Sequence, residues 1–107
     1  MLSSIIKKNI QLIDYEKIKH KNGKRVIAFG KFAGNSGTID ILYGLGQFLL
    51  NKGLGNQFLN ICQSYHYFNI DNAKDHIRRV GKNIEYQGLP IDICPFIVGV
   101  TGYGNCS

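Results

Sequence analysis

The feature that most constrains the fold is an apolar run near the end of the chain that leads directly into two glycines. The run is Phe96-Ile97-Val98-Gly99-Val100, and Gly102-Tyr103-Gly104 follows it. A short, continuously apolar segment before a glycine turn is typical of a buried parallel strand that feeds a phosphate-binding turn. In a dinucleotide-binding unit the turn leads into a helix whose N-terminus holds the pyrophosphate. The sequence stops at Ser107 before any such helix, so we expect it to be cut from a longer polypeptide.

On its own, the pair Gly102-x-Gly104 is a weak indicator of dinucleotide binding, because glycine pairs after apolar strands often mark only tight turns. Ser107 stands where the third glycine of the standard fingerprint would be. The acidic residue expected about 20 positions later would lie beyond the sequence. A cofactor loop and a plain turn both remain open on this pattern alone.

Length and charge set broad limits on function. A chain of 107 residues with 44% hydrophobic content can bury one modest core. No apolar stretch approaches the roughly 20 residues that span a bilayer, and the apolar patch at the start is too short for a signal peptide. We therefore expect no membrane contact. We expect an intracellular location, and both the cytoplasm and the mitochondrial matrix remain open. The net charge of +6 favours anionic partners, which are carboxylates, phosphates or nucleic acid.

The cysteines and histidines do not define a metal site. Cys62, Cys94 and Cys106 are an odd number at wide spacing, which indicates free thiols in a reducing compartment. Cys62 and His66 are four residues apart and could share a metal with Cys94 or His76, but the chain lacks a close pair such as CxxC. We therefore predict no metal, and interpret the cysteines as core residues and the histidine as a surface residue.

The first third of the chain is predicted to contain a short helix, a strand and a hairpin. Residues 3 to 8 have a helical pattern that ends near Asn9, and residues 10 to 15 are typical of a strand. Asn22-Gly23 lies between extended runs and predicts a two-residue type I′ hairpin, in which both central residues need positive φ.

Basic residues gather on this hairpin with no acidic residue among them: Lys17, Lys19, Lys21, Lys24, Arg25 and Lys31. We interpret them as a solvated surface and predict no nucleic-acid binding, because aromatic residues are not interleaved with the charges. Arg25 differs from the others because it enters an apolar strand, where its planar guanidinium could hold a carboxylate through two hydrogen bonds.

Two longer helices are expected in the rest of the chain. Apolar residues at steps of three and four predict a helix over residues 33 to 52, ended by Gly53. Glycines at positions 37, 44 and 46 weaken a helix and therefore suggest close packing or a hinge. An aromatic connection over residues 54 to 70 follows. A second helix then begins after Asp71 or Asn69 as its N-cap and is closed by Gly88 and Pro90.

Several segments resemble, in the same order, the lysine-ketoglutarate reductase part of the alpha-aminoadipic semialdehyde synthase family. They are "LIDYEKI" at 12 to 18, "RVIAFGKFAGNSGTIDILYGLGQFLL" at 25 to 50, "NAKDHIRRVGKNIEYQGLP" at 72 to 90 and "TGYGN" at 101 to 105. That family is related to single-function saccharopine dehydrogenases and more remotely to alanine dehydrogenases. The resemblance covers nearly the whole chain.

The resemblance implies an α/β fold of two domains joined by long helices across a cleft. Residues 1 to 32 would be the end of an N-terminal substrate-side domain that includes the hairpin. Residues 33 to 90 would be the interdomain helical segment. Residues 91 to 107 would be the truncated start, a first strand and turn, of a Rossmann-like dinucleotide-binding domain.

The implied reaction of the parent enzyme is the condensation of lysine with 2-oxoglutarate and reduction by NADPH to saccharopine, in lysine degradation. NADP is the implied cofactor of the parent, with NAD as the alternative. Arg25 matches a substrate-binding arginine and Phe29 a pocket residue. The cofactor loop is matched by Gly102, Gly104, Asn105 and Cys106.

The family's proton-transfer lysine and histidine match positions upstream of this chain, so no catalytic residue is assigned. We expect the isolated chain to bind no cofactor and to be inactive. The alternative is a stand-alone, non-catalytic small protein that binds its full-length relative or another anionic partner.

Overall fold

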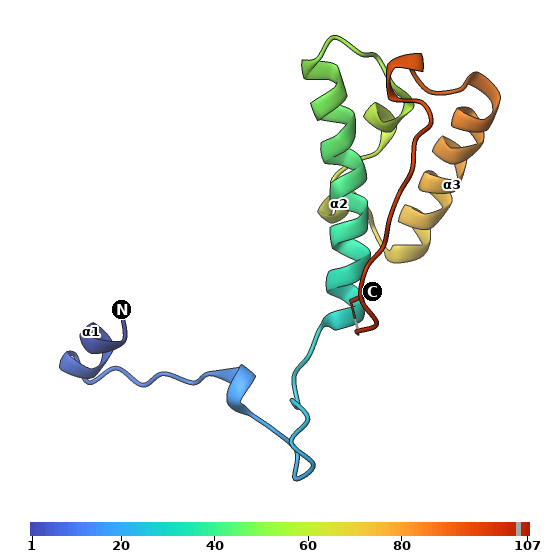
Figure 1. The fold of residues 1–107 in the computed structure, drawn as a ribbon. Coiled ribbons are helices and arrows are strands. Elements are labelled where there is room, and N and C mark those ends of the chain that lie inside the picture. The colour runs from blue at the N-terminus through green and yellow to red at the C-terminus, as the bar shows by residue number, and fades with distance from the viewer. Residues whose placement is uncertain (105) are drawn as a thin grey trace.

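The computed structural model describes residues 1–104 and 106–107, and their regular structure is helical. The α-helices are α1 (Leu2–Lys7), α2 (Gly30–Asn51) and α3 (Ile70–Gln87). Single 3-10 turns lie between and after them: η1 (Tyr15–Lys17), η2 (Gln57–Asn60), η3 (Ser64–His66) and η4 (Ile91–Ile93). Figure 1 shows α2 and α3 side by side, with the C-terminal segment running along α2 and the N-terminal third extending away from both.

Helix α2 confirms the predicted first long helix and begins earlier than expected, at Gly30. The helix buries Ile39 and Leu49, two of the apolar residues whose spacing predicted it. It ends as expected, because Gly53 has a φ of 78° and so turns the chain in the left-handed conformation that glycine adopts without strain.

Of the three glycines that the sequence singled out within α2, at positions 37, 44 and 46, one allows a close approach of the backbone. A Cβ atom on Gly46 would lie 2.8 Å from the carbonyl carbon of Phe58 in η2. The Asn56 side chain, just before η2, donates a hydrogen bond of 3.1 Å to the Gly46 carbonyl. Gly37 and Gly44 face open space. The predicted close packing is therefore confirmed for Gly46 alone.

Helix α3 begins and ends at the residues that the sequence indicated. Asn69 is the N-cap, and its side chain accepts a hydrogen bond of 2.8 Å from the backbone N–H of Asn72. At the other end, Gly88 has a φ of 78° and its N–H donates to the Ile84 carbonyl at 2.7 Å. Both ends thus satisfy backbone groups that a helix leaves unpaired.

Replacing Asn69 by alanine is expected to destabilise the helical part by about 1 kcal/mol, because the Asn72 N–H loses its partner. Urea unfolding followed by circular dichroism at 222 nm would measure the loss. Asn72→Ala is the matched control, since its side chain is not the cap and should change stability little. Equal effects of the two substitutions would contradict this assignment of the cap.

The core lies where α2, η2 and α3 meet. It consists of Ile39, Leu49, Phe58, Ile61, Ala73 and Val80. The C-terminal segment joins it through the ring of Phe96, whose centroid lies 5.5 Å from that of Phe58. No described residue before Ile39 is buried. The radius of gyration is accordingly 19.7 Å, against about 13 Å for a compact chain of 100 residues.

The predicted strand over residues 10 to 15 is wrong. The chain there is irregular and then enters η1, whose N-cap Asp14 accepts a hydrogen bond of 3.0 Å from the Glu16 N–H. A strand needs a partner for its backbone groups, and an aspartate cap instead satisfies the turn locally. The predicted short helix before it is confirmed by α1, which the chain leaves through Asn9 at a φ of 49°.

The predicted hairpin is present, but its turn differs from the predicted type. Lys19 and Arg25 form an antiparallel bridge, and the His20 N–H donates to the Lys24 carbonyl at 2.8 Å. Gly23 has a φ of 80°, whereas Asn22 does not have the positive φ that a type I′ turn requires. The loop therefore has three residues and ends in a left-handed glycine, which is the next most common hairpin geometry.

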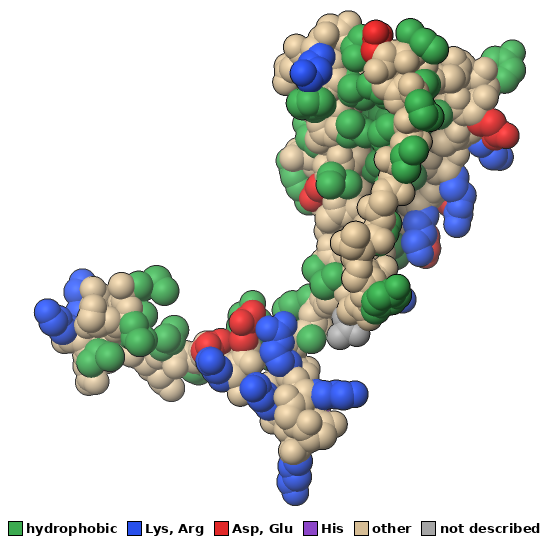
Figure 2. All heavy atoms as spheres, in the orientation of Figure 1, with side chains coloured by type: hydrophobic (Ala, Val, Ile, Leu, Met, Phe, Trp, Pro, Cys, Tyr) green, Lys and Arg blue, Asp and Glu red, His purple; other side chains and the backbone are tan. Residues whose placement is uncertain are grey.

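The segment from Phe96 to Val100 forms no strand in the part of the chain that the structure describes. Ile97, Val98 and Val100 are 82%, 66% and 78% exposed, so this apolar run lies uncovered beside α2. Figure 2 shows hydrophobic side chains on the visible surface of the helical part. The α/β class and the Rossmann-like strand concern a longer protein and stay predictions. Among the described residues, no helix is long and apolar enough to cross a membrane.

Candidate functional site at the start of helix α2

Arg25 lies on the second arm of the hairpin, and a carboxylate already faces its guanidinium. Its Nη1 atom is 3.3 Å from Oε1 of Glu16, which belongs to η1. The side chains of Arg25 and Glu16 are 45% and 58% exposed. The ion pair is therefore open to solvent, where another carboxylate can compete for the guanidinium.

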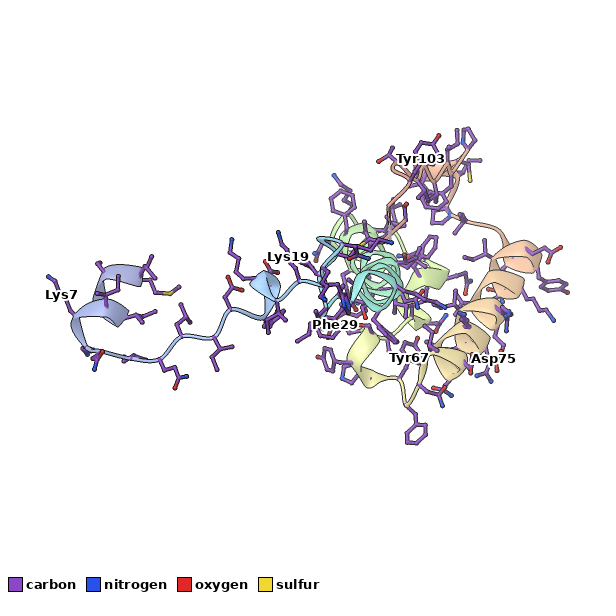
Figure 3. The ribbon with its side chains drawn as sticks, turned by 90° about the horizontal axis from the view of Figure 1, so that it is seen from below. Lys7, Lys19, Phe29, Tyr67, Asp75 and Tyr103 are labelled. Atoms are coloured by element: carbon purple, nitrogen blue, oxygen red, sulfur yellow. The ribbon has the colours of Figure 1, made fainter. Side chains whose placement is uncertain are left out.

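Phe29 directly precedes α2, at its N-cap position, and more than half of its surface is exposed. The ring of Tyr15 meets it edge to face, with centroids 6.4 Å apart. Figure 3, which looks along α2, shows Phe29 beside the helix. Tyr15 and Glu16 are consecutive residues of η1, and they contact the two predicted substrate residues, Phe29 and Arg25 respectively. This role of η1 was not predicted from the sequence, although the capping residue Asp14 could have indicated the turn.

The glycine turn at the end of the chain closes on itself. Gly102 has a φ of 98°, a backbone conformation in which a residue with a side chain would be strained. Both the backbone N–H and the hydroxyl of Ser107 donate to the Gly104 carbonyl, at 3.3 Å and 3.0 Å. Asn105, a predicted cofactor residue, lies outside the described residues.

This turn packs against the beginning of α2. A Cβ atom on Gly34 would collide with the backbone of Cys106, so glycine is required for the approach. The contact borders a shallow polar pocket lined by Lys31, Gly34, Asn35, Thr38, Cys106 and Ser107. The described part of the predicted cofactor loop therefore lies at the end of α2 that Phe29 precedes, which the sequence did not predict. Figure 1 shows the C-terminus beside this end.

The described part of the turn fits the first half of a phosphate-binding loop. Gly102 supplies the positive φ, Gly104 leaves open space, and Lys31 is among the residues that line the adjoining pocket. The second half of such a site is a helix N-terminus, and residues 106–107 do not form one. The residues present can thus approach a phosphate but do not complete a dinucleotide site.

The cysteines differ from their predicted positions. Cys62, Cys94 and Cys106 are free, as predicted, but all three are exposed, so their assignment to the core was wrong. In the segment around Cys62, the neighbouring residue Ile61 is buried and Cys62 itself is exposed. His66 is exposed, as predicted. Within the described residues, no three His, Cys, Asp or Glu side chains gather as metal ligands.

No protein-family model matches the chain. Curated proteins do, over all 107 residues. The chain is 44% identical to alpha-aminoadipic semialdehyde synthase of Arabidopsis thaliana, of which it covers 10%. It is 40% and 37% identical to mitochondrial alpha-aminoadipic semialdehyde synthases of Bos taurus and Mus musculus, and it covers 12% of each.

The chain thus spans about a tenth of the length of these relatives, and it corresponds to one segment of a much longer protein. Identity of this level along the complete chain indicates common descent. Over its whole length the chain is therefore homologous to one segment of proteins named alpha-aminoadipic semialdehyde synthase. The resemblance noted in its sequence is confirmed.

Proposed function

We propose that the chain is the part of a lysine-ketoglutarate reductase that connects the substrate-side domain to the dinucleotide-binding domain. The observation that carries the proposal is the match of all 107 residues to alpha-aminoadipic semialdehyde synthases. The reaction is the joining of lysine to 2-oxoglutarate with reduction to saccharopine, as a step of lysine degradation. Two of the relatives are named mitochondrial, which favours the matrix over the cytoplasm as its location.

In this proposal Arg25 binds a substrate carboxylate and Phe29 forms part of the pocket wall. The pair of Arg25 with Glu16 supports the role of the arginine, because a guanidinium that faces one carboxylate from an exposed position can accept another in its place. Lysine, 2-oxoglutarate and saccharopine all carry carboxylates, and the positive charge of the chain suits them.

Gly102, Gly104, Asn105 and Cys106 are proposed to form the first part of the loop that holds NADP, or NAD. The bound nicotinamide supplies the hydride. The contact of Cys106 with Gly34 supports this assignment, because it brings the turn to the end of α2 where Phe29 lies. Helix α2 then positions substrate residues and cofactor loop relative to each other. No proton-transfer group is assigned to this chain, so the chain alone is expected to be inactive.

Replacing Arg25 by glutamine in a polypeptide extended to the length of the relatives is expected to raise the KM for 2-oxoglutarate about 10-fold to 100-fold. The loss corresponds to one charge-assisted pair, about 1.5 to 3 kcal/mol. The measurement is NADPH oxidation that depends on both lysine and 2-oxoglutarate.

Lys24→Gln is the matched control, since it removes the same charge one residue away and should leave the KM nearly unchanged. An equal effect of both substitutions would reject the role of Arg25. Absence of any turnover in the folded, extended wild-type protein would reject the proposed function itself.

A further inference from the structure

A second polar concavity lies on the side of the molecule formed by α3 and η2. Asn60, at the end of η2, and His76, Arg79 and Asn83 of α3 line it together with Val80. The three polar residues of α3 are three and four positions apart, so they share one face of the helix. Val80 is buried, with 2% of its surface exposed. The lining contains hydrogen-bonding side chains and no carboxylate.

The guanidinium of Arg79 is available for a ligand. The ion pairs in the described part of the chain are Arg25 with Glu16 and Arg78 with Asp75, and neither involves Arg79. Its neighbour Arg78 lies 2.6 Å from Asp75 and is outside the concavity. The adjacent arginines of α3 therefore differ, since Arg78 is paired with a carboxylate and Arg79 lines the concavity without such a pair among the described residues.

The imidazole of His76 is fixed in one orientation by Tyr67. The Tyr67 hydroxyl oxygen accepts a hydrogen bond of 3.1 Å from the Cys62 N–H and lies 2.8 Å from Nδ1 of His76. When the hydroxyl donates its own proton to Nδ1, the imidazole carries its proton on Nε2. Nε2 is then a hydrogen-bond donor, as it also is when both ring nitrogens carry a proton. Sequence spacing did not indicate this chain of hydrogen bonds.

From these observations we propose that the concavity of Asn60, His76, Arg79 and Asn83 binds a small oxyanion, a phosphate or carboxylate group. Arginine offers two parallel N–H donors to such a group, and the histidine and the asparagine amides add further donors around it. Since the site lies in the body of α3, side chains and not a helix terminus supply the attraction. It shares no residue with the site at the start of α2, so it stands independently of the proposed function.

The test is a titration of the 15N-labelled 107-residue chain with inorganic phosphate, and separately with malonate, followed by NMR. Ionic strength is held constant with chloride, because screening alone shifts surface amides. We expect saturable shifts centred on residues 60, 76, 79 and 83 with a Kd of order 1 mM. Saturation by phosphate identifies a phosphorylated ligand and saturation by malonate a dicarboxylate, and either supports the site. Saturation by neither overturns it.

Arg79→Gln is expected to raise the Kd at least about tenfold, whereas Arg78→Gln should leave it within about twofold. The two variants lose the same charge from adjacent positions, so equal weakening would show general attraction to the basic helix and overturn the proposal. If circular dichroism shows that Arg79→Gln loses helix, Asn83→Ala takes its place. Alanine favours the helix, so a loss of affinity there reports the missing amide.

Discussion

Replacing Phe58 by alanine is expected to remove most of the stability of the helical part. Phe58 is only 5% exposed and lies where η2 packs on α2, with the ring of Phe96 against its own. Truncation of a buried phenylalanine costs about 3 to 5 kcal/mol, which is comparable to the whole stability of a small domain. Urea unfolding followed by circular dichroism should show the midpoint falling sharply or the cooperative transition disappearing.

Phe48→Ala is the control for this substitution, because it removes the same ring from an exposed position of α2. Phe48 is 56% exposed, and the amine of Lys52 lies over its ring, 5.0 Å from the ring centroid. Its loss should cost less than about 1 kcal/mol. If the two variants lost equal stability, the core at α2, η2 and α3 would not be the main source of stability.

Replacing Gly46 by alanine is expected to destabilise the protein by about 1 to 3 kcal/mol, although alanine is the better helix former. The added methyl group would lie 2.8 Å from the carbonyl carbon and 3.0 Å from the carbonyl oxygen of Phe58. Both atoms belong to the backbone, so η2 must move away from α2, and the hydrogen bond from Asn56 to the Gly46 carbonyl is disturbed with it. Thermal unfolding of the two proteins measures the difference.

Gly44→Ala provides a control of opposite sign on the same helix. A Cβ atom at position 44 meets nothing within 4 Å, so only helix propensity acts. The substitution should stabilise the protein by up to about 1 kcal/mol. Stabilisation by alanine at both positions would contradict the close approach of η2 to Gly46.

The helices could be predicted because their signals are local. Asn69 and Gly88 define the ends of α3 through hydrogen bonds within one turn, and the apolar spacing of α2 reflects one buried face. The strand over residues 10 to 15 was predicted wrongly because strand formation depends on a partner that local sequence does not reveal. The hairpin lies between these cases, since Asn22-Gly23 located the turn but not its length.

The sequence predicted which residues belong to the candidate site but not how these residues are arranged in space. Arg25, Phe29 and the glycine turn were named from the sequence, but the position of the glycine turn at the end of α2 that Phe29 precedes depends on the long-range contact of Cys106 with Gly34. The contacts of Arg25 with Glu16 and of Phe29 with Tyr15 likewise depend on the turn η1, which begins at the last residue of the predicted strand and was not itself predicted. Spacing along a chain does not encode such contacts.

The approach of Cys106 to Gly34 also has a consequence for the order of folding. It joins positions about 70 residues apart, and closing so long a loop brings an entropic cost that contacts within and between neighbouring helices avoid. Helices α2 and α3 with η2 can therefore assemble first, and the C-terminal segment, whose residues after Phe96 are largely exposed, docks afterwards. The same segment is the first to detach, so the C-terminal turn can separate from the start of α2 while the helices remain folded.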